Sequence, residues 1–134
     1  MSVSSAHPKG GDLLFAHISD LHISGPGELA YGKVPVGKNL ERTVAYINAL
    51  DPQPQLTLVT GDILGTGELS HAHEAARLLG ALDMPWYIVP GNHDDRGALR
   101  EAFAEQNRPT VDDEFIQYAF TASGVRFIGL DTSE

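Results

Sequence analysis

Three short apolar segments, each ending abruptly in polar residues, constrain what this chain can fold into. They are residues 13–19, 56–60 and 86–89. Apolar runs of this length, bounded by glycine or proline, are typical of strands that lie inside a sheet with both faces covered. Apolar residues recur at helical spacing after each segment. Strand–helix alternation of this kind predicts an α/β protein with a mostly parallel sheet, right-handed crossovers and flanking helices.

The connecting segments carry signals of their own. Residues 24–38 are rich in glycine and proline, which predicts a long loop over the strand ends. Helices are predicted at residues 40–50, 68–82 and 98–103, and hairpin strands at residues 115–120 and 125–130. The second helix is expected to bury Leu69, Ala72, Ala76 and Leu79. We expect residues 1–11 to form a flexible N-terminal tail and residues 12–134 to form one domain.

Polar side chains with metal-binding or proton-handling chemistry follow each apolar segment. They are Asp20, His22, Asp62, Asn92 and His93. Because parallel strands end at the same edge of a sheet, all five are expected to lie together at that edge. Carboxylate, imidazole and amide groups gathered in this way predict a metal site, where each cluster alone would be only a polar turn. The turn interpretation fits the whole set poorly, because glycine flanks two of the three clusters and because the residue types together match one metal site.

The five side chains suit a particular reaction. Asp20 and His22 supply two ligands to one metal ion, and Asp62 can bridge two ions through its two oxygens. Asn92 supplies a neutral oxygen to the second ion. Two ions about 3.5–4 Å apart that share a water are suited to in-line displacement at phosphorus. His93, beside the second ion, is suited to give a proton to the leaving oxygen.

Composition narrows the function further. The chain of 134 residues contains no cysteine, so any metal must be held by histidine, aspartate, glutamate or asparagine. The net charge of −9 argues against nucleic-acid or acidic-membrane binding. An anionic substrate remains compatible, because bound divalent metals can invert the local field. No run is long enough for a signal peptide or membrane span, and a cytoplasmic location is expected.

The three motifs together resemble one known family. Asp20-x-His22, Gly61-Asp62 and Gly91-Asn92-His93-Asp94, each after an apolar strand and in this order, resemble the calcineurin-like metallophosphoesterases. The segments 29–34, 56–64 and 85–96 are most similar to the bacterial class III cyclic-nucleotide phosphodiesterases, a branch that includes glycerophosphodiesterases.

This resemblance implies an αββα sandwich and a small-molecule phosphodiester substrate. It also implies a centre of two divalent ions, often iron, manganese or zinc, whose bound hydroxide is the nucleophile. In the family the residues matching Asp20, His22, Asp62 and Asn92 are ligands, and the residue matching His93 is the catalytic histidine.

The resemblance also implies further ligands, an isolated histidine and a Gly-His-x-His motif, that this sequence does not contain. We therefore expect the N-terminal half of the sandwich, with residues 12–134 as a C-terminally truncated phosphoesterase domain. The main prediction is a metal-dependent phosphodiesterase. The alternatives are an incomplete fragment that only binds metal or pairs with another chain as an oligomer, and another phosphatase or nuclease of the superfamily.

The remaining histidines have local explanations. His71 and His73 are two residues apart in a predicted helix, so their side chains point about 200° apart and cannot share one ion. A solvated helix face is predicted for them. His17 is one residue out of phase with Asp20 and its neighbour Ile18, which predicts a core or interface histidine.

Four charged residues near the motifs also have two interpretations each. Asp94 and Asp95 fit equally the roles of orienting the catalytic histidine and of capping the following helix. Asp131 ends the last predicted strand and fits either the edge of the site or a turn. Arg96 could meet a phosphate, although an isolated surface cation is the more common case.

Overall fold

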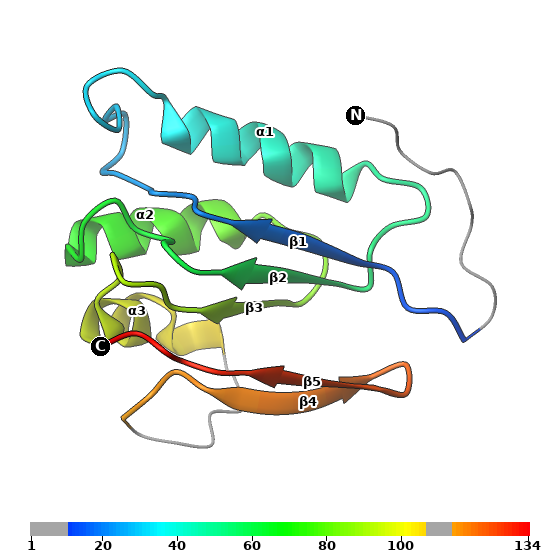
Figure 1. Ribbon diagram of the computed structural model, residues 1–134. Helices are drawn as coiled ribbons and strands as arrows, with labels where there is room; N and C mark the ends of the chain where they lie inside the picture. The colour runs from blue at the N-terminus through cyan, green and yellow to red at the C-terminus, as the bar shows by residue number, and fades with distance from the viewer. Residues whose placement is uncertain (1–10, 107–113) are drawn as a thin grey trace.

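The computed structural model describes residues 11–106 and 114–134 (Figure 1). The predicted tail, residues 1–11, lies outside this part of the chain except for Gly11. The elements are β1 (Phe15–Ser19), α1 (Val36–Asn48), β2 (Leu56–Thr60), α2 (Leu69–Leu79), β3 (Trp86–Val89), α3 (Arg96–Ala102), the 3-10 turn η1 (Ala104–Gln106), β4 (Tyr118–Ala122) and β5 (Val125–Gly129). The predicted α/β class is confirmed.

The first three strands form a parallel sheet in the order β1-β2-β3. Ser19 pairs with Thr60, and Thr60 pairs with Val89, so the three strands end level with one another. Whatever follows each strand is therefore delivered to the same edge of the sheet, as the sequence predicted.

The helices cover one face of this sheet. Figure 1 shows α1 and α2 on the side away from the β4–β5 hairpin, with α3 beside β3. In α1, Leu40, Val44 and Ile47 recur at helical spacing and are all buried in the core. The sheet contributes Val59 and Ile88 to the same core. This packing fixes the strands that carry the polar loops.

The opposite face of the sheet meets the hairpin through aromatic rings. Phe15 of β1 packs edge-on against Phe127 of β5 with ring centroids 5.7 Å apart. Tyr87 of β3 stacks on Phe120 of β4 at 3.9 Å. Because β1 and β3 flank β2, these two contacts lay the hairpin across the sheet face rather than beside its edge.

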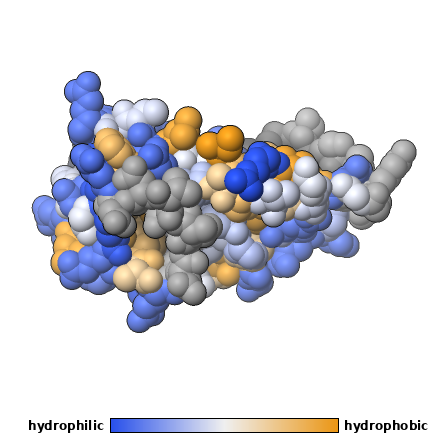
Figure 2. Space-filling model, turned by 90° about the horizontal axis from the view of Figure 1, so that it is seen from below, coloured by the Kyte–Doolittle hydropathy of each residue, from blue (hydrophilic) through white to orange (hydrophobic). Residues whose placement is uncertain are grey.

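The prediction that residues 13–19 form a strand covered on both faces is wrong. Alternate residues of β1 are exposed, and Phe15 keeps 43% of its surface accessible. The reason is that β1 lies at the edge of the sheet, and the hairpin contacts this face of β1 through Phe15, which it covers only in part. Figure 2, viewed from below Figure 1 where the hairpin lies, shows hydrophobic surface among hydrophilic residues on this side. Ile128 and Leu130 are 66% and 60% exposed.

The hairpin itself is formed, but its first strand is displaced from residues 115–120 to Tyr118–Ala122, and its second strand ends at Gly129 rather than at residue 130. Its turn lies at Ser123 and Gly124, whose φ values of 48° and 78° suit a tight two-residue turn. The first strand begins at Tyr118 rather than at residue 115, because the backbone N–H of Ile116 donates to the Asp131 carboxylate instead of to a neighbouring strand.

The buried face of α2 also differs from the prediction. Its buried residues are His71, Ala72, Glu74, Ala75, Leu78 and Leu79. Leu69 is 37% exposed, and the predicted stripe is therefore rotated. The polar residues on the buried side have partners: Arg77 donates two hydrogen bonds to Glu74, at 2.8 and 2.7 Å. A count of apolar residues alone does not register such paired polar groups.

Candidate metal centre

The loops after β1 and β2 remain paired beyond the ends of the strands. The backbone N–H of Asp20 donates to the carbonyl of Gly61 at 3.1 Å, and that of His22 donates to the carbonyl of Asp62 at 3.0 Å. Asp20, His22 and Asp62 have positive φ values of 55°, 47° and 47°. Left-handed backbone is unfavourable for residues with a side chain and is concentrated at functional sites. All three candidate ligands adopt it.

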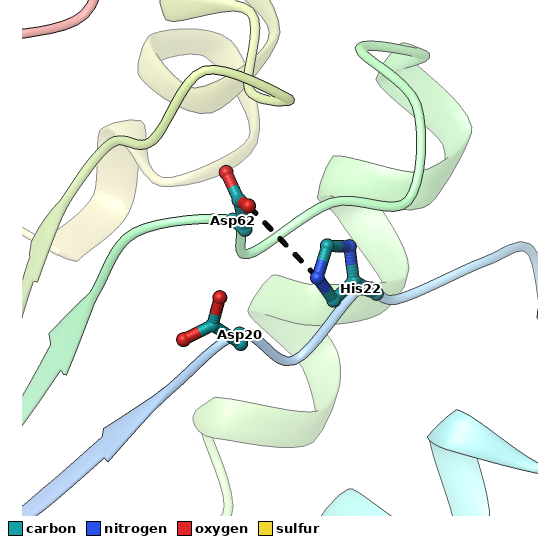
Figure 3. Close-up of side chains that lie close together, drawn as sticks. All are labelled: Asp20, His22 and Asp62. Atoms are coloured by element: carbon teal, nitrogen blue, oxygen red, sulfur yellow. Dashed lines mark ion pairs between the residues drawn. The ribbon is translucent and has the colours of Figure 1, made fainter.

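These backbone turns direct three side chains toward one point. One ligand atom from each of Asp20, His22 and Asp62 lies within 4.8 Å of the other two. Figure 3 shows the group, with His22 Nε2 lying 3.9 Å from Asp62 Oδ2. The His22 and Asp62 side chains are 23% and 17% exposed, so the group is accessible from solvent but partly desolvated.

The donors in this cluster fit a metal ion. Two carboxylates and an imidazole are the oxygen and nitrogen ligands that divalent transition metals bind. His22 Nδ1 is buried and has no hydrogen-bond partner in the part of the chain that the structure describes. The nitrogen that faces the Asp62 carboxylate is instead Nε2, at 3.9 Å, so Nε2 is the atom that would coordinate an ion beside the two carboxylates.

The loop after β3 brings His93 to the same place. The backbone N–H of His93 donates to Asp62 Oδ1 at 3.2 Å, and the His93 ring lies edge-on to the His22 ring, with centroids 5.3 Å apart. Gly91 makes this approach sterically possible. A Cβ atom added there would lie 2.3 Å from both the backbone nitrogen and Oδ1 of Asp62.

Asn92 is exposed in the same loop and lines a cavity of about 450 Å³. The rest of the lining comes from Pro90, Gly91 and the segment 132–134. The structure therefore brings Asp20, His22, Asp62 and His93 together. Asn92 directly precedes His93 in the chain and lines the neighbouring cavity.

Asp94 and Asp95 have separate roles. The Asp94 carboxylate accepts hydrogen bonds from the backbone N–H groups of Gly91, Ile63 and Leu64. Burial, with a smaller contribution from the nearby Asp62 charge, raises the pKa of Asp94 above its usual value against the effect of these bonds. Asp95 caps α3 and accepts from the backbone N–H of Ala98 at 2.8 Å. The capping interpretation is confirmed for Asp95, while Asp94 contacts backbone on two loops.

Arg96 is not an isolated cation. Its guanidinium donates to both oxygens of Asp131, at 2.7 and 3.1 Å, and lies over the ring of Phe115. The Asp131 side chain is fully buried and also accepts from the backbone of Ile116 and from Ser133. Burial alone would raise the pKa of Asp131, but these donors outweigh it and hold that pKa well below its ordinary value.

One prediction about the histidines is wrong, and for another, His17, only the core alternative is excluded. His71 does not lie on a solvated face: it is 7% exposed, and its Nδ1 lies 3.1 Å from the hydroxyl of Thr66. His73 is exposed as expected. His17 is exposed rather than in the core, and its Nε2 lies 2.7 Å from the hydroxyl of Thr60 on the adjacent strand.

The fold and the cluster together define an α/β protein with a candidate metal centre at the carboxyl edge of a parallel sheet. A sequence model described as calcineurin-like phosphoesterase matches residues 13–131. The chain belongs to the calcineurin-like phosphoesterase family. Calcineurin-like phosphoesterases use divalent metals, in keeping with the donors present here.

Several curated proteins are similar to the chain. It is 34% identical over 121 residues to a probable glycerophosphodiester phosphodiesterase of Arcobacter nitrofigilis, a match that covers 90% of this chain and 44% of that protein. It is 32% identical to a glycerophosphodiester phosphodiesterase of Enterobacter lignolyticus, with 90% and 44% covered. It is 31% identical to a cAMP/cGMP dual specificity phosphodiesterase of Mycobacterium tuberculosis, with 97% and 41% covered.

The predicted resemblance to this branch of the family is confirmed. The chain spans less than half of the length of these relatives, and the matches cover their N-terminal part. None of the helices in the described ranges 11–106 and 114–134 is long and apolar enough to cross a membrane.

Proposed function

We propose that the chain forms the metal-binding N-terminal part of a phosphodiesterase that hydrolyses small phosphodiesters of the glycerophosphodiester or cyclic-nucleotide type. The observation that carries this proposal is the cluster of Asp20, His22 and Asp62, whose ligand atoms lie within 4.8 Å of one another. The names of the relatives support the same reaction class. The net charge of −9 favours a small substrate over a nucleic acid.

In this proposal the cluster holds two divalent ions of iron, manganese or zinc. Asp20 and His22 would hold the first ion, Asp62 would contribute to holding both, and Asn92 would hold the second. When bound, the ions neutralise charge on the phosphoryl oxygens and lower the pKa of the attacking water. Asp62 is well placed for its double role, because its loop contacts both the β1 loop and the β3 loop.

His93 is the proposed acid. Its backbone is held by Asp62, and its ring lies beside the His22 ring at the open edge of the sheet. A proton held on a ring nitrogen of His93 can pass to the ester oxygen that leaves as an alcohol, which avoids the release of an alkoxide. Such proton transfer contributes about 10²–10⁴-fold to rate in other enzymes.

The test is hydrolysis of bis(p-nitrophenyl) phosphate by the chain with added Mn²⁺ or Fe²⁺, alongside calorimetric titration of the same ions. His93→Ala is expected to lower kcat with little effect on metal affinity, whereas Asp62→Asn is expected to weaken metal binding. His73→Ala, at an exposed histidine on α2, is the matched control. Comparison of glycerophosphocholine, cAMP and single-stranded DNA then separates the substrate classes.

Metal binding without release of p-nitrophenol, both by the wild-type chain and by any longer product of the same gene, would contradict the hydrolase proposal. That result would favour a second candidate, a metal-binding domain that pairs with a second copy of itself. The exposed side chains of Ile128 and Leu130 on the hairpin side favour this candidate. Light scattering during size-exclusion chromatography distinguishes the two, since a monomer at all concentrations counts against pairing.

A further inference from the structure

The Asp94 carboxylate joins two loops that are far apart in sequence. Its Oδ2 accepts from the backbone N–H of Gly91 at 2.8 Å and from that of Ile63 at 3.1 Å, and its Oδ1 accepts from that of Leu64 at 2.7 Å. Gly91 belongs to the loop after β3, whereas Ile63 and Leu64 belong to the loop after β2. One side chain therefore holds the backbone of both loops.

Both loops carry candidate ligands next to these bonds. Asp62 directly precedes Ile63, and Asn92 directly follows Gly91. The backbone at Asp62 has a φ of 47°, a conformation that costs energy unless its surroundings impose it. The Asp94 bonds to the next two N–H groups are such a restraint, because charge-assisted hydrogen bonds to a carboxylate are among the strongest in proteins.

We propose that Asp94 is a positioning residue for the metal centre, which fixes the Asp62 and Asn92 loops relative to each other through their backbone. The inference rests on the proposed function, in which Asp62 and Asn92 bind metal. Asp94 has no coordinating role in it. The Asp94 carboxylate is turned toward three backbone donors, and through these bonds it determines the separation between the loops of Asp62 and Asn92.

Asp95 provides a matched control. It is the same residue type, one position along the chain, and its carboxylate also accepts a backbone hydrogen bond. That bond goes to Ala98 within α3. Asp95 also lies close to Gly67 of the loop after β2, but through its Cβ and backbone, which asparagine retains. Both variants remove one negative charge and weaken a backbone hydrogen bond, whereas only the change at Asp94 disturbs the bonds to the two loops.

The experiment compares wild type, Asp94→Asn and Asp95→Asn. Asparagine keeps the size of Asp94 but replaces one acceptor oxygen with an NH₂ group that faces a backbone donor. Mn²⁺ alone is titrated into each protein in a calorimeter, at a temperature well below the midpoint of thermal unfolding. Asp94→Asn is expected to bind Mn²⁺ about 10–100-fold more weakly than wild type. Asp95→Asn is expected to bind Mn²⁺ as wild type does.

Backbone amide NMR of the metal-free proteins gives a second readout. Asp94→Asn is expected to shift the Asp62 and Asn92 amide resonances, and Asp95→Asn is not. If Asp94→Asn does not fold, the same two measurements are made on Asp94→Glu. This variant keeps both carboxylate oxygens but displaces them by one methylene.

The outcomes separate this inference from the proposed function. Tight Mn²⁺ binding by folded Asp94→Asn would overturn the positioning role and leave the proposed function standing. Absence of Mn²⁺ binding in the wild type would overturn the metal-dependent function. In that case the metal-free amide shifts still decide whether Asp94 positions the two loops: unchanged Asp62 and Asn92 resonances in Asp94→Asn overturn the inference.

Discussion

Replacing Gly91 with alanine tests whether the close contact between two loops builds the metal centre. The added Cβ would lie 2.3 Å from both the backbone nitrogen and Oδ1 of Asp62, and 3.0 Å from the carbonyl carbon of Gly61. Real contacts of this kind are essentially never shorter than 3.0 Å, so the loops must separate by about 0.7 Å, from 2.3 to 3.0 Å. Rotation of the Asp62 side chain could move Oδ1 away, but it would not relieve the contact with the Asp62 backbone nitrogen at 2.3 Å.

The size of the effect follows from overpacking and from misplacement of a ligand. Overpacking a well-packed site costs about 1–3 kcal/mol, and contacts to backbone place Gly91→Ala in the upper part of that range. Gly91 does not have a positive φ, so the cost arises from contact rather than from backbone conformation. Displacement of Asp62 is expected to weaken Mn²⁺ binding by about 10–100-fold, the loss usually found when residues that orient metal ligands are mutated.

The assay is urea unfolding of metal-free protein together with Mn²⁺ titration. Gly37→Ala is the control, because the Cβ added there in α1 meets only the Leu78 side chain of α2 at 3.9 Å, an ordinary van der Waals contact. This control is expected to be neutral or to stabilise by about 0.5–1 kcal/mol, since alanine is favoured over glycine in a helix. Wild-type stability and wild-type Mn²⁺ affinity in Gly91→Ala would refute the reasoning.

Three further predictions concern the ion pair and the cluster. Asp131→Asn is expected to destabilise the fold by about 2–4 kcal/mol, because it leaves the Arg96 guanidinium without its buried partner, and urea unfolding at neutral pH measures this. Because the pKa of Asp131 is lowered on folding, its stabilisation is present above the unfolded pKa of about 3.9 and is lost as pH falls. The stability difference between wild type and Asp131→Asn should therefore narrow in titrations below about pH 4. Mn²⁺ is expected to raise the thermal midpoint of wild type but not of His22→Ala, and an equal rise in both would contradict the cluster as the binding site.

The strands could be predicted from sequence because each signal was strong and local. The bounds of β2 and β3 agree with the apolar runs at 56–60 and 86–89, where glycine or proline ends each strand. The common edge of the sheet followed from parallel pairing alone. What the apolar pattern could not predict was the exposed face of β1, which depends on how much of the sheet the hairpin covers.

Buried polar groups were the other source of error. His71 faces the interior because Thr66 and two glutamates, Glu28 and Glu68, lie around its ring, at 3.1, 3.6 and 3.8 Å. Arg96 is paired with Asp131, which lies 35 positions along the chain. Partners so distant, or supplied by a loop, leave no periodic signal in sequence. The Asp94 bonds to Ile63 and Leu64, 31 and 30 positions away, belong to the same class.

The candidate metal centre is thus positioned at two levels that have different physical origins. Level strand ends bring the three loops to one edge, which places the ligands to within the spacing of neighbouring strands, about 4.7–4.9 Å. A coordinating site needs its groups held to within about 0.5 Å, which strand pairing alone does not provide. The finer placement comes from left-handed backbone at Asp20, His22 and Asp62, held by continued pairing between the loops and by the Asp94 carboxylate. Because those turns are unfavourable on their own, the loops should relax when the restraint is removed, even though the sheet beneath them remains folded.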